Sequence, residues 1–177
     1  MYRRLLALLA VVTIVSAATA AVVMASGKSL PSDVQAVRAA VARYHSYSQA
    51  LADGYILPPN EPCISSPAGA MGFHLINPKL MADPAIDPLH PEIVLYVPDA
   101  DGTLRFAAVE YFKADADGDL STDSDRPTAL GHAFDGPMPG HNPAMPVHYD
   151  LHVWLAQDNP KGLFTQFNPA VSCGGAG

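Results

Sequence analysis

Polar and apolar residues alternate without a break from residue 147 to residue 155. Every second position is hydrophobic or aromatic: Val147, Tyr149, Leu151, Val153 and Leu155. The positions between them hold His148, Asp150, His152 and Trp154. A period of two predicts a β-strand with one buried face, so that His148, Asp150 and His152 share the other face. The four-residue spacing of the two histidines also fits one face of a helix.

Similar patterns predict the other elements. A helix is expected from Pro31-Ser32-Asp33 onward, because apolar residues recur at helical spacing as far as Leu51, and Gly54 ends it. Strands are predicted over 69–77, 92–97 and 103–112, and the turn 98–102 joins the last two into a hairpin. Long loops are predicted between these elements. We therefore expect an α+β fold, with one N-terminal helix packed on a curved, mostly antiparallel sheet with long loops. Cystatin-like and ferredoxin-like strand orders both fit this pattern.

The N-terminal segment has the pattern of a targeting sequence. Arg3 and Arg4 precede an apolar run, and small residues follow it. Residues 1–26 are therefore predicted to be a signal peptide, with a retained N-terminal anchor as the alternative. Residues 27–177 are predicted to form a single α+β domain. The protein is expected to be exported, to the extracellular space or the cell envelope.

Charge and cysteine content narrow the function classes. Without Arg3 and Arg4, the chain has eight basic residues against 17 acidic ones. This acidic balance predicts no nucleic-acid partner and no membrane contact beyond the N-terminal segment. The partners themselves cannot be identified from the sequence. The two cysteines, Cys63 and Cys173, are expected to form a disulfide in an oxidising compartment.

A set of histidines and carboxylates provides the candidate chemistry. Glu110 lies in a strand whose same-face neighbours are apolar, and a carboxylate there needs a cation, an imidazole or a metal ion as its partner. His74 follows Gly72, which would leave space for a ligand beside the imidazole. Together with His148 and His152, these residues resemble the ligands of a metal site, and Asp150 would support them or add a ligand. The expected cofactor is a transition metal (zinc, iron, manganese or copper). The alternative for each residue is an ordinary structural role.

Two further segments allow metal binding. Met138, His141 and Met145 lie in a loop rich in glycine and proline, and methionine with histidine suits copper, although methionines in such loops often serve only as packing contacts. The acidic run 115–125 fits either a weak calcium site or a solvated loop. It departs from the EF-hand pattern, which requires a glutamate where this loop has Ser124.

Four segments carry a resemblance to other proteins: 69–78 (GAMGFHLINP), 109–112 (VEYF), 134–141 (FDGPMPGH) and 145–154 (MPVHYDLHVW). With them the chain resembles a group of uncharacterised exported bacterial proteins over residues 40–173. That group has no established activity, so the resemblance implies a bacterial secretory setting and a single domain but no catalytic role.

Three functions remain open at this point. The chain is interpreted first as an exported domain that binds a transition metal or small ligand through His74, Glu110, His148 and His152 on one sheet face. The alternative is a non-catalytic envelope protein whose histidine-rich face is an interaction or structural surface. An enzyme that uses Glu110 or a histidine as general base is the third. The sequence contains neither a glycine-rich phosphate loop nor a nucleophile elbow, which disfavours enzymes built on those motifs.

Overall fold

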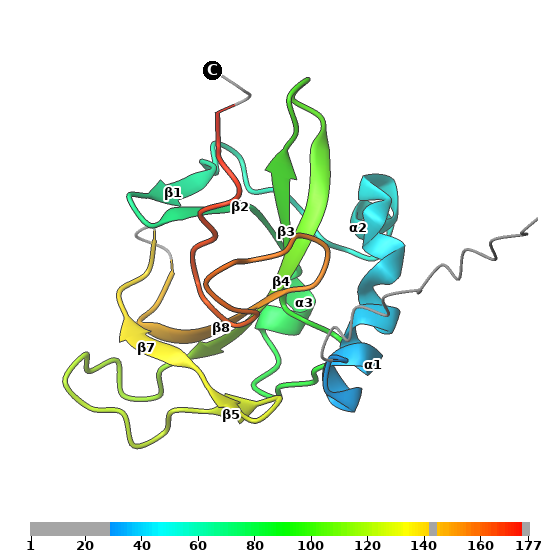
Figure 1. Cartoon of the computed structure of the whole chain (residues 1–177). Coiled ribbons are helices and arrows are strands. Elements are labelled where there is room, and N and C mark those ends of the chain that lie inside the picture. Colours follow the sequence, from blue (N-terminus) through cyan, green and yellow to red (C-terminus); the bar gives the residue numbers. More distant parts are fainter. Residues whose placement is uncertain (1–28, 142–144, 175–177) are drawn as a thin grey trace, which may run out of the picture.

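A computed structural model describes residues 29–141 and 145–174 of the chain. The signal peptide or anchor predicted over residues 1–26 lies outside the described residues. The main element is a curled, antiparallel sheet of six strands in the order β1-β2-β3-β4-β8-β7 (Figure 1). Its strands are β1 (Ile64–Ser66), β2 (Gly69–Ile76), β3 (Ile93–Pro98), β4 (Leu104–Ala114), β7 (Asp135–Met138) and β8 (His148–Trp154). A separate two-stranded ribbon pairs β5 (Thr128–Ala129) with β6 (His132–Ala133).

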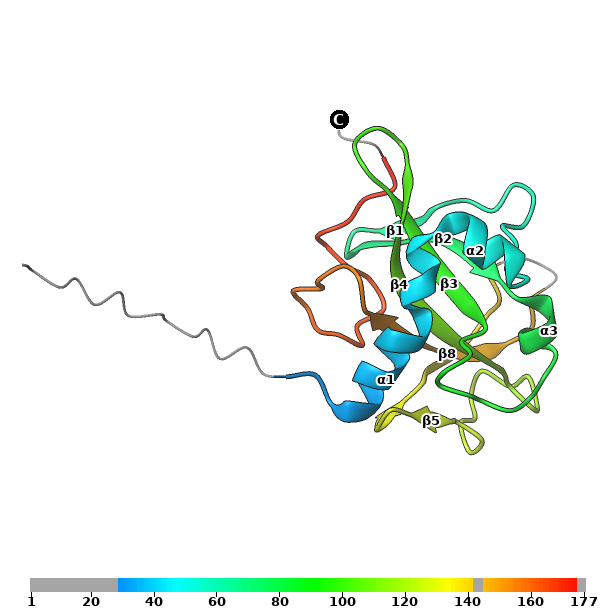
Figure 2. The same ribbon diagram turned by 90° about the vertical axis from the view of Figure 1, so that its right-hand side faces the viewer.

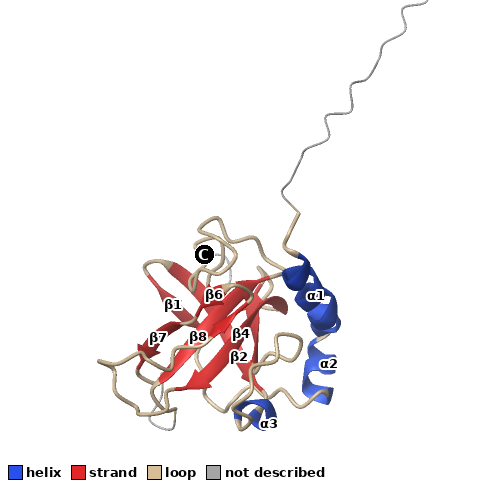
Figure 3. Cartoon of the chain, turned by 90° about the horizontal axis from the view of Figure 1, so that it is seen from below, coloured by secondary structure: helices blue, strands red, loops and turns tan. Residues whose placement is uncertain are grey.

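Helices cover one face of this sheet, as Figures 2 and 3 show from two directions. They are α1 (Ser32–Val41), the 3-10 helix η1 (Ala42–His45) and α2 (Tyr47–Ala52). A further short helix, α3 (Pro78–Met81), lies at the end of β2. The predicted α+β fold, with an N-terminal helical segment on a curved antiparallel sheet, is confirmed. The core under the helices contains Tyr149, Leu151 and Val153, which are the apolar positions of the alternating strand.

The prediction of one continuous N-terminal helix is wrong, because the structure divides this segment into α1, η1 and α2. The helix stops at Ser46, which is extended and caps α2 by accepting a hydrogen bond from the Gln49 amide. This break changes which residues face the sheet. Ala50 is buried, whereas Leu51, expected in the apolar stripe, is 46% exposed.

A bulge changes the faces of the β3–β4 hairpin. The hairpin forms as predicted, but its register shifts between Leu95 and Tyr96, which pair with Ala108 and Phe106. Ala107 is therefore the extra residue on β4, and the alternation reverses there. For this reason Phe106 packs on the helix side, and not beside Glu110 as strict alternation predicts.

The C-terminal tail passes from the helix-side core to the other face of the sheet (orange to red in Figure 1). Leu163 and Phe164 pack against the helix-side core, whereas Val171 packs against the core of the other face. Trp154 donates its indole hydrogen to the Thr165 carbonyl at 2.7 Å, and Asn168 pairs with Ala70 through two backbone hydrogen bonds. The Cys63 and Cys173 sulfurs form the expected disulfide, with the Cα atoms 5.5 Å apart, which fastens the tail beside β1. None of the helices within the described residues has the length and apolar character needed to cross a membrane.

Candidate metal centre

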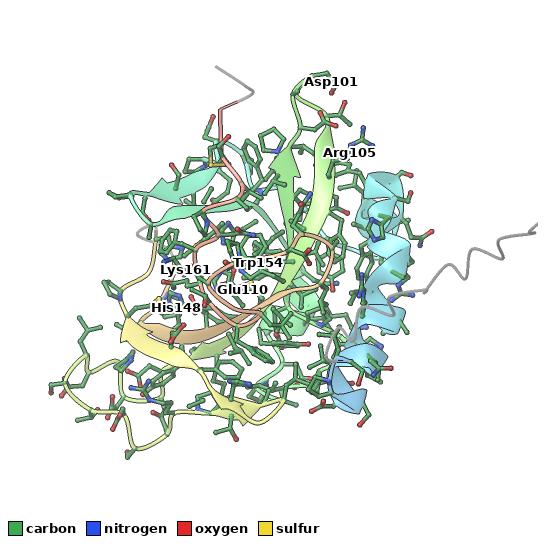
Figure 4. All side chains as sticks on the ribbon, in the orientation of Figure 1. Asp101, Arg105, Glu110, His148, Trp154 and Lys161 are labelled. Atoms are coloured by element: carbon green, nitrogen blue, oxygen red, sulfur yellow. A yellow bond between two sulfur atoms is a disulfide. The ribbon has the colours of Figure 1, made fainter. Side chains whose placement is uncertain are left out.

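The register of the sheet brings three site residues together on the face under the tail. Glu110 of β4 lies opposite His152 of β8. His74 comes from β2, which is separated from β4 by β3, where Ile93 is the direct neighbour of Glu110 and Leu95 that of His74. Because the sheet curls, the imidazole of His74 reaches Glu110 across β3. Figure 4 shows Glu110 within the body of the molecule, whereas Asp101 and Arg105 lie at the tip of the β3–β4 hairpin.

The ligand atoms of these three residues form a tight group. The Glu110 Oε2 atom lies 3.1 Å from His74 Nε2 and 3.4 Å from His152 Nε2. One ligand atom from each residue lies within 4.8 Å of the others, and all three residues are buried. At these distances none of the three side chains is aligned for a hydrogen bond. The three residues thus form close His–Glu pairs, and their ligand atoms are near enough together to hold one metal ion.

Asp150 supports His152 from behind. Its Oδ1 atom lies 3.5 Å from His152 Nδ1, so the carboxylate faces the ring nitrogen that points away from Glu110. The other oxygen, Oδ2, accepts a hydrogen bond from the Gln166 side chain at 3.2 Å. This is the carboxylate–histidine arrangement that orients imidazole ligands in metal sites. The tail residue Gln166 is a part of the site that the sequence analysis missed.

The charges of the cluster are strongly coupled. Burial by itself would raise the pKa of Glu110, but the charges of His152 and His74 outweigh it and lower that pKa to about 2. Burial opposes the protonation of His152, yet Glu110 and Asp150 raise its pKa to about 9. At neutral pH the metal-free cluster therefore holds an ionised Glu110 beside a protonated His152.

His148 lies on the same face but outside the three-residue group. Four residues of strand separate its Cα from that of His152, a distance of roughly 13 Å at about 3.3 Å per residue. Its Nδ1 atom donates to the Pro146 carbonyl at 3.0 Å, because a carbonyl can only accept, and its Nε2 lone pair is buried without a partner. The ring stacks on Phe112, with centroids 5.0 Å apart.

His141 joins the cluster, although the sequence analysis considered it only as part of a copper motif. Its ring centroid lies 6.3 Å from that of His74 and 5.5 Å from that of His148. Burial lowers the pKa of His141, against the attraction of Glu110. With His74 and Met145 it lines a cavity of about 300 Å³. Met138, by contrast, lies against the Gln166 side chain, with 3.8 Å between sulfur and nitrogen.

Two other sequence interpretations change. Gly72 does not leave space for a ligand, because a Cβ there would meet the Tyr96 carbonyl oxygen at 2.4 Å; the glycine admits the backbone of β3. In the acidic run, Asp117 and Asp119 accept hydrogen bonds from the loop's own amides and hydroxyls. Within residues 29–141 and 145–174, His74, Glu110 and His152 are the only three histidine, cysteine or acidic side chains whose ligand atoms gather within 4.8 Å, and the acidic run forms no such group.

Buried polar atoms without hydrogen bonds concentrate on this face. Eight of the eleven such side-chain atoms in the described residues belong to five residues: His74, Glu110, His148, Asp150 and His152. These are the five candidates that the sequence pattern selected. Because all five are buried, they do not offer an exposed interaction surface, whereas the structural role that the alternative hypothesis also allows is compatible with their burial.

No protein-family model, no curated protein and no solved structure matches this chain. The function must therefore be argued from the site.

Proposed function

We propose that this protein is an exported domain that binds one transition-metal ion through His74, Glu110 and His152. The observation that carries the proposal is the spacing of the ligand atoms. Two atoms that each lie 2.0–2.2 Å from one ion, at angles between octahedral and tetrahedral, are roughly 2.8–3.6 Å apart. The measured separations of 3.1 and 3.4 Å from Glu110 Oε2 fall in this range.

The energetics of burial support the same assignment. A carboxylate with no exposed surface is costly unless it is paired and hydrogen-bonded, and neither Glu110 oxygen has a hydrogen-bond donor. A divalent ion supplies the missing partner for the carboxylate and for both imidazole lone pairs at once.

The donor set restricts the metal but does not select one. Two imidazoles and one carboxylate bind iron in oxygenases and zinc in hydrolases, and manganese and copper also accept these donors. Three protein ligands leave at least one coordination position open. His148 Nε2 and His141 are the nearest additional imidazoles, and Asp150 holds His152 in place.

Export is supported by two features of the chain. The predicted targeting segment precedes the domain, and a disulfide forms and persists in oxidising compartments. The resemblance to exported bacterial proteins agrees with this setting.

Metal analysis of the purified protein tests the proposal. The protein, stripped with a chelator and reloaded in turn with zinc, iron(II), manganese and copper, is expected to retain about one equivalent of at least one of them after gel filtration. His74→Gln should lose most of that binding, because it removes one of three ligands. His90→Gln is the matched control, since His90 is exposed and bonds only Asp87. A wild-type protein that retains no metal, or equal retention in both variants, would refute the site.

A further inference from the structure

We propose that the cavity beside the metal centre binds a small, mainly apolar molecule whose anionic oxygen head takes the open position on the metal. This inference rests on the proposed function, because the head binds to the ion. It adds the class of ligand and the route by which the ligand reaches the site.

The cavity has the size and lining of a small-ligand site. Its volume of about 300 Å³ lies at the lower end of the range of roughly 300–1,000 Å³ for such sites. Most of its wall is apolar, formed by Ile76, Met81, Ile93 and Met145 together with two prolines. The polar groups of the wall are His74, His141 and Glu61. An apolar wall with few polar groups favours a ligand that buries a hydrocarbon part.

His74 connects the cavity to the metal centre. It is the only member of the three-ligand group that lines the cavity. Glu110 and His152 have no exposed surface and lie behind it. Of the three ligands only His74 borders the cavity, so the cavity is the side from which a ligand would approach the open position of an ion held there. His141, whose ring lies 6.3 Å from that of His74, forms the wall beside that position.

The charge of the loaded centre selects the head. A divalent ion with Glu110 and two neutral imidazoles carries one net positive charge, so its open position accepts an anionic oxygen, although the Asp150 carboxylate behind His152 offsets part of that charge. Glu61 does not cancel this preference, because it belongs to a partly exposed turn, in which its amide donates to the Pro58 carbonyl, and solvent screens its charge. The ligand is thus a small amphipathic acid, with its carboxylate on the metal and its tail between Ile76 and Met81.

Cobalt(II) substitution makes the ligand visible. Cobalt loading is measured first, as the metal-to-protein ratio. Hexanoate and acetate are then titrated into the loaded and the metal-free protein, with the visible cobalt bands and calorimetry as readouts. Hexanoate is expected to shift the cobalt bands and to bind at least about tenfold more tightly than acetate, since only its longer tail buries methylenes in the cavity. Neither acid should bind the metal-free protein.

A cavity-filling variant tests the location. Met81→Trp should leave cobalt binding intact and remove the preference for hexanoate, because the indole fills the place of the tail. Lys79→Trp, on the exposed side of the same short helix, should keep the preference. Equal affinities of hexanoate and acetate in the loaded wild type, or a preference that survives in a folded Met81→Trp protein, would overturn the inference alone. A wild type that takes up no cobalt and none of the other metals would overturn the proposed function, and this inference with it.

Discussion

Metal binding to this site should release a proton at neutral pH. The adjacent carboxylates Glu110 and Asp150 raise the pKa of His152 to about 9, from an ordinary value of 6.5. A metal ion binds only the neutral imidazole, so the proton on His152 must leave when the ion enters. Below pH 9 the affinity should therefore rise about tenfold for each pH unit, and between pH 7 and pH 9 by about a hundredfold, or roughly 3 kcal/mol.

Calorimetry measures this proton directly. Titration of zinc at pH 7.0 in two buffers with different ionisation enthalpies should give close to one proton released per ion. Competition with a chelator at pH 6.5, 7.0, 7.5 and 8.0 should give the slope of affinity against pH. Asp150→Asn should release fewer protons, because it removes one of the charges that raise the pKa of His152 while all three ligands remain. Asp87→Asn, which alters an exposed carboxylate beside His90, is the control and should change neither value. An affinity that is flat between pH 7 and pH 8, with no proton released, would show that His152 is neutral before the metal binds and would refute the charge assignment.

Three further predictions concern the scaffold. Burial raises the pKa of Glu92 from 4.5 to about 7, so this residue favours the folded state below pH 4.5 and loses that stabilisation as pH rises through 7. Glu92→Gln should accordingly stabilise the protein by roughly 2–3 kcal/mol at pH 8 in urea unfolding but not at pH 4.5, and equal gains at both would contradict the burial argument. Leu151→Ala should cost roughly 2–5 kcal/mol, because the side chain is buried beneath the helices, whereas Leu120→Ala, at an exposed position, should change the free energy of unfolding by less than about 0.5 kcal/mol. Replacing Cys63 and Cys173 together by alanine should cost roughly 4–5 kcal/mol for a loop of this length, and titration of the unreduced, denatured wild type should find no free thiol in the mature chain.

The sequence predicted those features that depend on the local alternation of polar and apolar residues. The alternation over 147–155 correctly assigned β8, its apolar core face and the shared face of His148 and His152, but the prediction of a single buried face was wrong, because all seven residues of β8 are buried. The prediction that Glu110 is buried beside a histidine is also confirmed, because an apolar strand face cannot hold a carboxylate without a partner. The sequence did not reveal the break at Ser46, since a serine cap competes with helix continuation only by a small free-energy difference.

Other features depended on contacts that no local pattern encodes. The strand β7 contains Gly136 and Pro137, residues that disfavour a strand, and it forms only because the edge of β8 is available. His141 reaches the cluster through the path of a loop, and Gln166 reaches Asp150 through the path of the tail. Their spacing along the sequence carries no trace of either contact. The sequence did single out His141 in its glycine- and proline-rich loop, but with Met138 and Met145 as partners and not with His74 and His148.

The burial of the cluster is itself an argument about function. A protein that needed only a stable core could replace Glu110 and the imidazoles beside it with apolar side chains, and such replacements are often neutral or stabilising. This chain instead keeps eight buried polar atoms without hydrogen bonds on one face of its sheet, with close charge pairs around Glu110 and His152, and a disulfide holds the tail beside β1. Within the described residues, no hydrogen bond to these eight atoms offsets the free-energy cost of burying them. A metal ion held as proposed would offset part of it, because it would coordinate Glu110, His74 and His152, whose closest atoms are spaced as its ligands would be.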